Sequence, residues 1–515
     1  MKLNYKRTLC VGFAFFLISM FWQAYDSIIP KILTDKFGMA QADSGIIMAL
    51  DNVLALFMLP LFGTLSDKCR SRFGRRTPFI VVGAVLASVF LMILTIADGM
   101  QLKNLNAVKD LDTPEALTTL YDFDYETTLM TPGGEKYVLA ETAEEGVTAI
   151  SREQFLGMQL SIEQNGKTVT NPDYAAYVAP ARQAYANAMT QQNPKALILF
   201  IVVLLLLLIS MATFRSPAVA LMPDVTIKPL RSKGNAVINL MGSAGGILIL
   251  VLGIVFGTGS AKNALMNYSV FFGLVAAMMI TALVLFLLTV RENKFVREMH
   301  ELSRAHGLET EDDDEKKDAG DRKLSSGEKR SMIFILLSIV MWFFGYNAAT
   351  SKYSVYASNV LSRDYNTTLI IAQAAAIISY LPVGMIASKV GRKKCIHAGI
   401  IMLAVAFFSA SFLRQNASLL IINALFALAG IGWATINVNS FPMVVEMCRG
   451  GDVGRYTGYY YTASMAAQTL TPYFSGLMMD KFGLTALFPY STVFVCIAFI
   501  TMIFVKHGDS KPQKK

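Results

Sequence analysis

Apolar runs long enough to cross a membrane recur along the whole chain and restrict its fold more than any other feature. An α-helix needs about 20 predominantly apolar residues to span the hydrocarbon core of a bilayer. Only 16% of the 515 residues are charged, whereas soluble domains carry about 25%. We therefore expect an all-α membrane protein with twelve transmembrane helices.

The apolar runs form two groups of six, separated by a densely charged segment. Short basic links join several of the runs, and positive charge is retained on the cytoplasmic side of a membrane. Both termini are basic, so we expect both in the cytoplasm. The expected divisions are 1–97 (helices 1–3), 98–194 (an insertion), 195–290 (helices 4–6), 291–330 (a solvated cytoplasmic linker), 331–505 (helices 7–12) and 506–515 (a cytoplasmic tail).

Residues 98–194 differ in character from the rest of the chain. They contain 14 acidic against 6 basic residues, a net charge of −8, which is typical of a non-cytoplasmic segment. We expect a small α+β domain or a partly ordered lid between helices 3 and 4. The alternative is a tolerated loop insertion with no role of its own.

The two groups of helices repeat each other, which is typical of transporters built from two related bundles. In each group the matching positions follow the same order along the chain. The pairs are Trp22-x-x-Tyr25-Asp26 with Trp342-x-x-x-Tyr346-Asn347, Gly74-Arg-Arg with Gly391-Arg-Lys, and Pro217…Asp224…Arg231 with Pro442…Glu446…Arg455. The repetition predicts two six-helix bundles related by pseudo-symmetry.

A strongly basic link joins the second and third runs, between Gly63 and Ile80. Its sequence resembles the loop between helices 2 and 3 of major facilitator superfamily transporters. Within that superfamily it is most similar to the sucrose-transporter and glycoside–pentoside–hexuronide branch, with a pattern close to G-x-x-S-D-R-C-x-S-R-x-G-R-R-R-P-F-I. Thr77 stands where that pattern has a third arginine. The resemblance implies the two-bundle fold and transport of a sugar or glycoside.

The acidic and basic groups at the cytoplasmic helix ends are candidates for a gate. In this interpretation they pair in one conformation and separate in the other. The alternative is ordinary capping of helix ends. The candidate gate residues are Asp67, Arg75, Arg76, Asp224, Arg231, Glu446 and Arg455.

Three ionisable residues are predicted well inside the spans: Asp26, Asp51 and Arg215. Such residues cost energy in a membrane and tend to be functional. One arginine can neutralise only one carboxylate, so the other must hold a proton or a cation. We choose Asp51 with Asn52 as the coupling site, because helix 2 carries the cation site in the symporters that the chain resembles. Asp26 is then assigned to substrate binding, with Arg215 as its partner. The alternative is that Asp26 couples the ion and Asp51 binds the substrate.

The sugar expected from the resemblance would stack on aromatic faces and bind amide and charged groups through its hydroxyls. For any single aromatic residue, core packing or anchoring at the lipid interface is the alternative. The candidate substrate residues are Tyr25, Asp26, Arg215, Trp342, Tyr346, Asn347, Gln373, Asn437, Asn439 and Gln468.

Two departures from the family pattern leave the coupling ion open between H⁺ and Na⁺. The helix-4 aspartate of the plant sucrose carriers aligns with Leu208. The second helix-2 acid of the melibiose-type relatives aligns with Ala55.

Taken together, these features predict a sugar–cation symporter that works by alternating access in the plasma (inner) membrane. The alternatives are a proton-coupled exporter of amphipathic compounds and a non-transporting sugar sensor. The chain has no Walker A, H-E-x-x-H or G-x-S-x-G motif, so we expect no enzyme, no metal site and no cofactor besides the coupling ion. The net charge of +9 lies largely in short links, so the expected partners are a sugar and the bilayer, without nucleic acid, and we expect a monomer.

Overall fold

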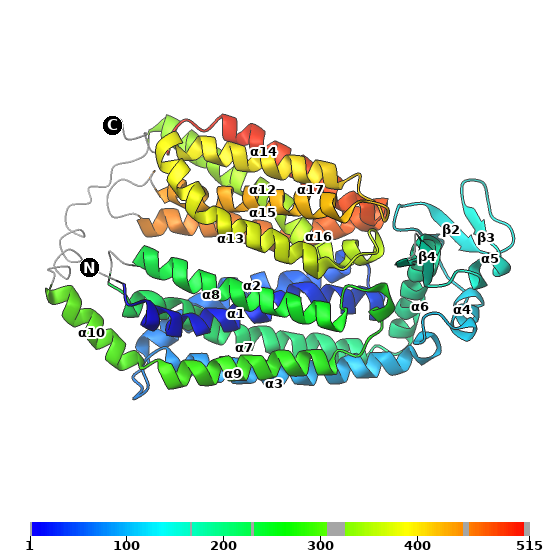
Figure 1. Ribbon diagram of the computed structural model, residues 1–515, viewed down its shortest axis with the longest axis horizontal. Helices are drawn as coiled ribbons and strands as arrows, with labels where there is room; N and C mark the ends of the chain where they lie inside the picture. Colours follow the sequence, from blue (N-terminus) through cyan, green and yellow to red (C-terminus); the bar gives the residue numbers. More distant parts are fainter. Residues whose placement is uncertain are drawn as a thin grey trace.

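The computed structural model describes residues 3–164, 167–227, 231–305, 325–445, 447 and 453–508. Within these residues, twelve long helices form two bundles of six (Figure 1). The predicted all-α architecture of two bundles is confirmed. The N-terminal bundle contains α1 (Tyr5–Lys31), α2 (Gln41–Lys68), α3 (Thr77–Asn104), α7 (Lys195–Val225), α8 (Arg231–Phe256) and α9 (Ser269–Thr289). The C-terminal bundle contains α12 (Ser326–Asn359), α13 (Tyr365–Val390), α14 (Arg392–Ala410), α15 (Leu419–Val445), α16 (Val453–Phe482) and α17 (Leu487–Ile503).

Ten of the helices in the described part of the chain are long and apolar enough to cross a membrane. The other two bundle helices, α13 and α16, are also long enough, at 26 and 30 residues. They carry Gln373 and Gln468 respectively. Polar residues are tolerated on a spanning helix when they face the bundle interior or a cavity, and Gln373 does so.

Each bundle has its own apolar core. Phe21, Leu204 and Phe272 are fully buried in the N-terminal bundle, and Ile339 and Val495 in the C-terminal bundle. Because each core consists of residues from one bundle only, the two bundles pack as separate units that meet along a shared interface.

The insertion is a small α+β domain carried on the extended ends of α3 and α7 (Figure 1). Buried Tyr137, Phe155 and Tyr174 form its own core, and burial raises the pKa of the Tyr137 hydroxyl. Strand β2 pairs with β1 antiparallel and with β3 parallel, while β4 and β5 form a hairpin. Its elements are η2 (Asn106–Val108), α4 (Pro114–Tyr121), β1 (Leu129–Met130), β2 (Lys136–Leu139), β3 (Thr148–Ile150), α5 (Arg152–Leu156), β4 (Ser161–Gln164), β5 (Lys167–Thr170), η3 (Tyr174–Val178) and α6 (Ala179–Gln192).

The insertion contacts both bundles. Helix α6 packs on η1 (Ile32–Lys36), the π-helical end of α1, where Asn187 Nδ2 donates to the Gly38 carbonyl at 2.9 Å. Gln183 Nε2 also donates to Asp35 Oδ1 at 2.9 Å. On the other bundle, the backbone N–H of Thr485 donates to the Pro132 carbonyl at 3.3 Å. The insertion thus bridges the bundles at one end of the molecule.

The start of α1 and the end of α17 lie at the end of the bundles opposite to the insertion (Figure 1). The segment expected to be a solvated linker contributes helix α10 (Glu292–Ala305) at that end. Arg7 anchors this helix through an ion pair with Glu298 at 3.2 Å. Residues 306–324 of the predicted linker lie outside the described residues, and its last residues, 325–330, cap and begin α12.

Candidate functional site

A cavity of about 310 Å³ lies between the two bundles and is lined by both. Its volume falls within the usual range of small-molecule sites, about 300–1,000 Å³. Helix α1 contributes Asp26, Gln23 and Ser27, and α8 contributes Ser243. The polar and aromatic residues from the C-terminal bundle are Tyr346, Thr350, Tyr353, Ser354, Gln373, Tyr380, Phe407, Phe426 and Trp433.

The C-terminal wall of the cavity is an aromatic platform. The rings of Tyr346 and Trp433 stack with centroids 3.7 Å apart and planes 3° apart. Phe343 packs edge-on against Trp433 at 5.2 Å and fixes its orientation. Tyr380 lines the same wall, and its hydroxyl hydrogen-bonds with Asn437. A flat, rigid surface of this kind suits the apolar face of a ring-shaped ligand.

Two glutamines join the bundles at the cavity. Gln373 Nε2 of α13 donates to Gln23 Oε1 of α1 at 2.5 Å. Gln23 in turn donates through Nε2 to Ser27 Oγ at 3.0 Å. These amides are available to exchange their mutual hydrogen bond for bonds to a polar ligand.

The N-terminal wall carries charge. Asp26 is exposed within the cavity, whereas Asp51 and Arg215 are half-buried beside it. The three groups are close enough to interact electrostatically. Asn52 Nδ2 donates to Asp51 Oδ1 at 2.8 Å, as expected if the pair forms one site.

The predicted ion pair between Arg215 and Asp26 does not form in this conformation. Within the described residues, no carboxylate lies within ion-pair distance of Arg215. Its guanidinium instead lies over the ring of Trp22, 5.2 Å from the centroid. An arginine stacked on an aromatic ring remains free to bind an anion or a hydroxyl group.

Several predicted substrate residues lie away from the cavity wall. Tyr25 and Trp342 are 2% and 1% exposed and belong to the cores of their bundles, so the alternative of core packing applies to both. Asn439 donates to the Thr435 carbonyl and Gln468 to the Ser464 carbonyl within their own helices. Asn347 does not line the cavity either. Asn437 reaches it only through Tyr380.

The cavity residues that the sequence analysis did not identify include Gln23, Tyr380 and Trp433. Gln23 lies inside the repeated motif, between Trp22 and Tyr25, and its position was a usable signal. Trp433 is one of only 3 tryptophans in the chain. It stands in the almost uniformly apolar α15, where no periodicity marks the inward face.

Four of the predicted gate residues form one cluster at the end of the N-terminal bundle away from the insertion. Arg75 Nη2 and Arg76 Nε bind the two oxygens of Asp224 at 2.7 and 2.9 Å. Arg76 also pairs with Asp67 at 2.5 Å. The cluster joins α2, the start of α3 and α7. Because all three helices belong to one bundle, it braces that bundle internally.

Glu292 of α10 is a member of this cluster that the sequence did not reveal. Its carboxylate accepts hydrogen bonds from the backbone N–H groups of Arg75, Arg76 and Thr77 at 2.8–3.1 Å. These are unsatisfied donors at the N-terminus of α3, where negative charge is favoured. The remaining predicted gate groups, Glu446 and the side chains of Arg231 and Arg455, lie outside the described residues.

The end that carries the insertion is closed by contacts between the bundles. Asp480 of α16 accepts from the backbone N–H groups of Gln41 and Ala42 at 2.7 Å each. Buried Lys352 of α12 donates to the Gln41 carbonyl at 2.6 Å. A carboxylate of one bundle therefore caps helix α2 of the other. Lys31 Nζ adds a bond to Ser358 Oγ at 2.9 Å.

Two helical bundles enclosing a polar central cavity are the architecture of many membrane transporters. A family model described as the Major Facilitator Superfamily matches residues 334–515, and one described as an MFS/sugar transport protein matches residues 10–104. The two models match opposite bundles. Each model describes major facilitator proteins, so the chain is similar to this superfamily in both of its bundles.

Curated relatives match a short stretch of the chain. Sucrose transport protein SUC4 of Arabidopsis thaliana is 41% identical over 59 residues, which is 12% of each chain. Sucrose transport protein SUC3 of the same plant is 39% identical over 67 residues, 13% of this chain and 11% of that protein. The match thus spans only about an eighth of the relatives' length.

Solved structures match almost the whole chain at low identity. The xylose transporter XylE from E. coli in an inward open conformation has a TM-score of 0.59 at 14% identity, covering 99% of this chain and 98% of that one. A D-xylose-proton symporter has a TM-score of 0.57 at 15% identity, with coverage of 98% and 99%. A bacterial homologue of the iron transporter ferroportin in an inward-facing state has a TM-score of 0.56 at 12% identity, with coverage of 98% and 99%. These likenesses show the fold alone.

Proposed function

We propose that the protein is a symporter that carries a di- or oligosaccharide, or a glycoside, together with a cation. The observation that carries the proposal is the Tyr346–Trp433 platform on the wall opposite Asp26 in a cavity lined by both bundles. Aromatic rings pack on the C–H faces of a sugar, while carboxylates and amides bind its hydroxyls. The match to a sugar-transport family model and the sucrose transport relatives support a sugar as substrate.

Asp51 is the proposed coupling group. The cavity region holds two carboxylates and one guanidinium, so one negative charge is left over. In a membrane protein an uncompensated charge at this depth costs about 2.5–3.5 kcal/mol on the insertion scale. A proton or a sodium ion bound at Asp51, with Asn52 as a further oxygen ligand for sodium, removes that cost. The substrate gradient and the ion gradient are then coupled through the same wall.

The structure corresponds to the inward-facing state in this proposal. The bundles are bonded together at the insertion end through Asp480, Lys352 and Lys31. The insertion lies outside and the basic loop after α2 lies in the cytoplasm, because positive links are retained there. Alternating access then requires these outer bonds to break and equivalent contacts to form near the gate cluster.

Counterflow in proteoliposomes tests the function directly. Vesicles preloaded with an unlabelled sugar are mixed with a panel of labelled mono-, di- and oligosaccharides, with and without sodium and with and without a pH gradient. We expect transient accumulation of at least one sugar, and its inhibition in Trp433→Ala but not in the ring-preserving Trp433→Phe. Accumulation of amphipathic cations and of no sugar would support the exporter instead.

A further inference from the structure

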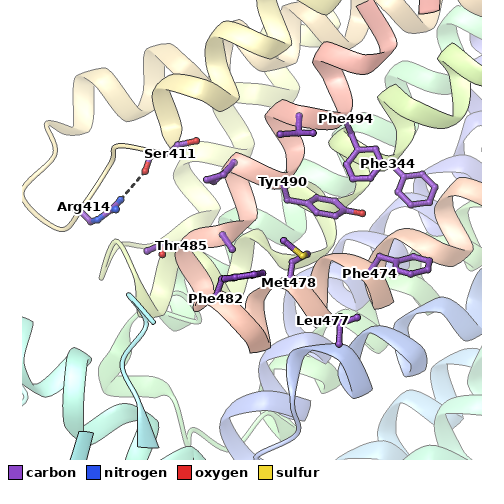
Figure 2. Close-up of a pocket in the computed structure, with 13 residues that line it drawn as sticks. Phe344, Ser411, Arg414, Phe474, Leu477, Met478, Phe482, Thr485, Tyr490 and Phe494 are labelled. Carbon is purple, nitrogen blue, oxygen red and sulfur yellow. Dashed lines mark hydrogen bonds between the residues drawn. The ribbon is translucent and has the colours of Figure 1, made fainter. Parts of the chain in front are cut away.

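A second, larger cavity lies on the flank of the C-terminal bundle, and it shares no residue with the central one. It has a volume of about 820 Å³ and lies among α12, α16, α17 and the turn after α14 (Figure 2). Phe482 and Thr485 lie at the insertion end of these helices, and Phe344 lies near the middle of α12. The cavity therefore runs from the outer membrane surface toward the bilayer centre.

Its walls are apolar and largely aromatic. The rings of Phe344 and Phe494 stack at 5.1 Å, and Tyr490 contacts Phe494 at 4.6 Å (Figure 2). Phe474 and Val493 are 42% and 56% exposed, so the cavity opens on the membrane-facing surface. Such walls offer a sugar few hydrogen bonds, but they match the methylene chain of a lipid.

Cations stand at the outer end of the cavity. Arg414 is exposed and donates through one guanidinium nitrogen to the Ser411 and Leu413 carbonyls at 2.9 and 2.8 Å (Figure 2). Its other nitrogens remain available, and no carboxylate among the described residues pairs with it. Lys481 is also exposed, and its ammonium lies 5.4 Å from the centroid of the ring of the lining residue Phe482. Two exposed cations thus stand at the end of the cavity where the lipid head groups would lie.

We propose that this cavity is a binding site for an anionic phospholipid. One acyl chain lies along the surface formed by Phe344, Phe494 and Tyr490, and the phosphate-containing head group binds Arg414 and Lys481. Guanidinium groups bind phosphate oxygens through paired, charge-assisted hydrogen bonds. Burying methylene groups in an apolar cavity adds packing contacts that the flat surface of a helix does not supply. Net negative charge on the lipid provides the specificity.

The site is placed to affect transport without touching the substrate. Phe344 lies two residues before Tyr346 of the aromatic platform, on the same helix. Phe474 and Phe482 lie on α16, which also carries Asp480 and so holds the closed end. A lipid lodged between α16 and α17 therefore packs against the helix that must move when the outer end opens.

Native mass spectrometry of the full chain, titrated with phosphatidylglycerol or with phosphatidylcholine of the same acyl chains, tests the proposal. We expect the wild type to retain one phosphatidylglycerol with at least tenfold higher affinity than phosphatidylcholine. Arg414→Gln/Lys481→Gln should reduce that preference to about twofold or less. The matched control Lys109→Gln/Lys136→Gln removes the same charge from the insertion surface and should leave the preference unchanged.

Filling the cavity provides the second arm. Val493→Trp places a large ring in the space for the acyl chain and should abolish retention of both lipids. If Val493→Trp does not fold, Ala486→Phe fills the outer part of the same space, and folding is checked by the thermal transition. Equal retention of the two lipids by the wild type would overturn the proposal. So would retention of phosphatidylglycerol that neither the charge variant nor the filled variant changes, or a dimer mass in place of a lipid adduct.

Discussion

The two walls of the central cavity are built from different chemistry. The N-terminal wall places Asp26 in the cavity with Asp51 and Arg215 beside it, whereas the C-terminal wall consists of uncharged rings and amides. Although the bundles are related by sequence repetition, Asp26 is matched by the neutral Asn347. Under the proposed function, this division places ion coupling on the charged wall and ring stacking on the aromatic wall, so single substitutions on opposite walls should produce different failures.

The largest effect is expected on the charged wall. Asp51→Asn keeps the shape of the side chain and its contact with Asn52 but removes the group that would hold the ion. We expect uphill accumulation of sugar driven by an ion gradient to be lost, while downhill exchange persists. Accumulation and exchange are measured on the same batch of proteoliposomes, so that a loss of folded protein, which lowers both, is recognised.

Asp26→Asn provides the comparison for this experiment. Because Asp26 faces the cavity, its substitution should weaken substrate binding and spare coupling. If Asp51→Asn still concentrates sugar and Asp26→Asn does not, the two roles are reversed. If both variants still concentrate sugar, the division between the walls is wrong.

A smaller effect is expected on the aromatic wall. Trp433→Ala removes one of the two stacked rings of the platform. The affinity for substrate should therefore fall about tenfold, which corresponds to ~1.4 kcal/mol of binding free energy. Trp433→Phe keeps a ring and should lose less than half of that free energy. Binding is measured by isothermal titration in detergent. An ion stoichiometry that changed in Trp433→Ala would contradict the separation of the two walls.

The sequence predicted the architecture because each bundle helix is marked by its own apolar run and the links carry their own charge. It also predicted three residues that line the cavity, Asp26, Tyr346 and Gln373, because polar side chains are conspicuous inside apolar runs. The sequence also predicted Trp342 as a substrate residue, whereas the structure buries Trp342, 1% exposed, in the core of the C-terminal bundle. A helix that is apolar all round does not reveal which face points inward, so Trp433 could not be chosen over Trp342.

The gate cluster shows the same limit for long-range contacts. Asp67, Arg76 and Asp224 were identified because charges at helix ends are few and recur in the repeat. Glu292 was not, since it stands at the start of a segment rich in charges of both signs. Its role depends on α10 returning to the start of α3, over 200 residues away in sequence. Such a contact is visible only in the folded chain.

The gate cluster itself should respond unequally to loss of its two acids. Asp224 binds two arginines and its side chain is 15% exposed, whereas Asp67 binds one and is 56% exposed. Asp224→Asn should therefore slow transport by about fivefold, or ~1 kcal/mol, and Asp67→Asn by twofold or less, as expected for an exposed pair. Initial rates at saturating sugar measure both. Loss of sugar binding in Asp67→Asn would show that it contacts substrate.

The smallest effect is expected where the insertion, which is anchored on the N-terminal bundle, reaches the other one. Gly134 has a φ of +94°, and a Cβ there would stand 2.6 Å from the Phe482 carbonyl oxygen. Gly134→Ala should push the turn away from α16 and weaken the closed outer end. Gly146→Ala is the matched control, because Gly146 has a φ of +86° and nothing lies within 4 Å of its added Cβ. Both variants carry the backbone cost of a left-handed alanine, about 1–2 kcal/mol, so their difference isolates the contact.

The measurement is the reactivity of a cysteine placed at Thr350, in the cavity, in a background free of the five native cysteines. With an impermeant thiol reagent added outside, this cysteine should react two- to threefold faster in Gly134→Ala than in Gly146→Ala. Equal rates would mean that the insertion rests on the C-terminal bundle without favouring either state, and that the two bundles alone set the balance between them.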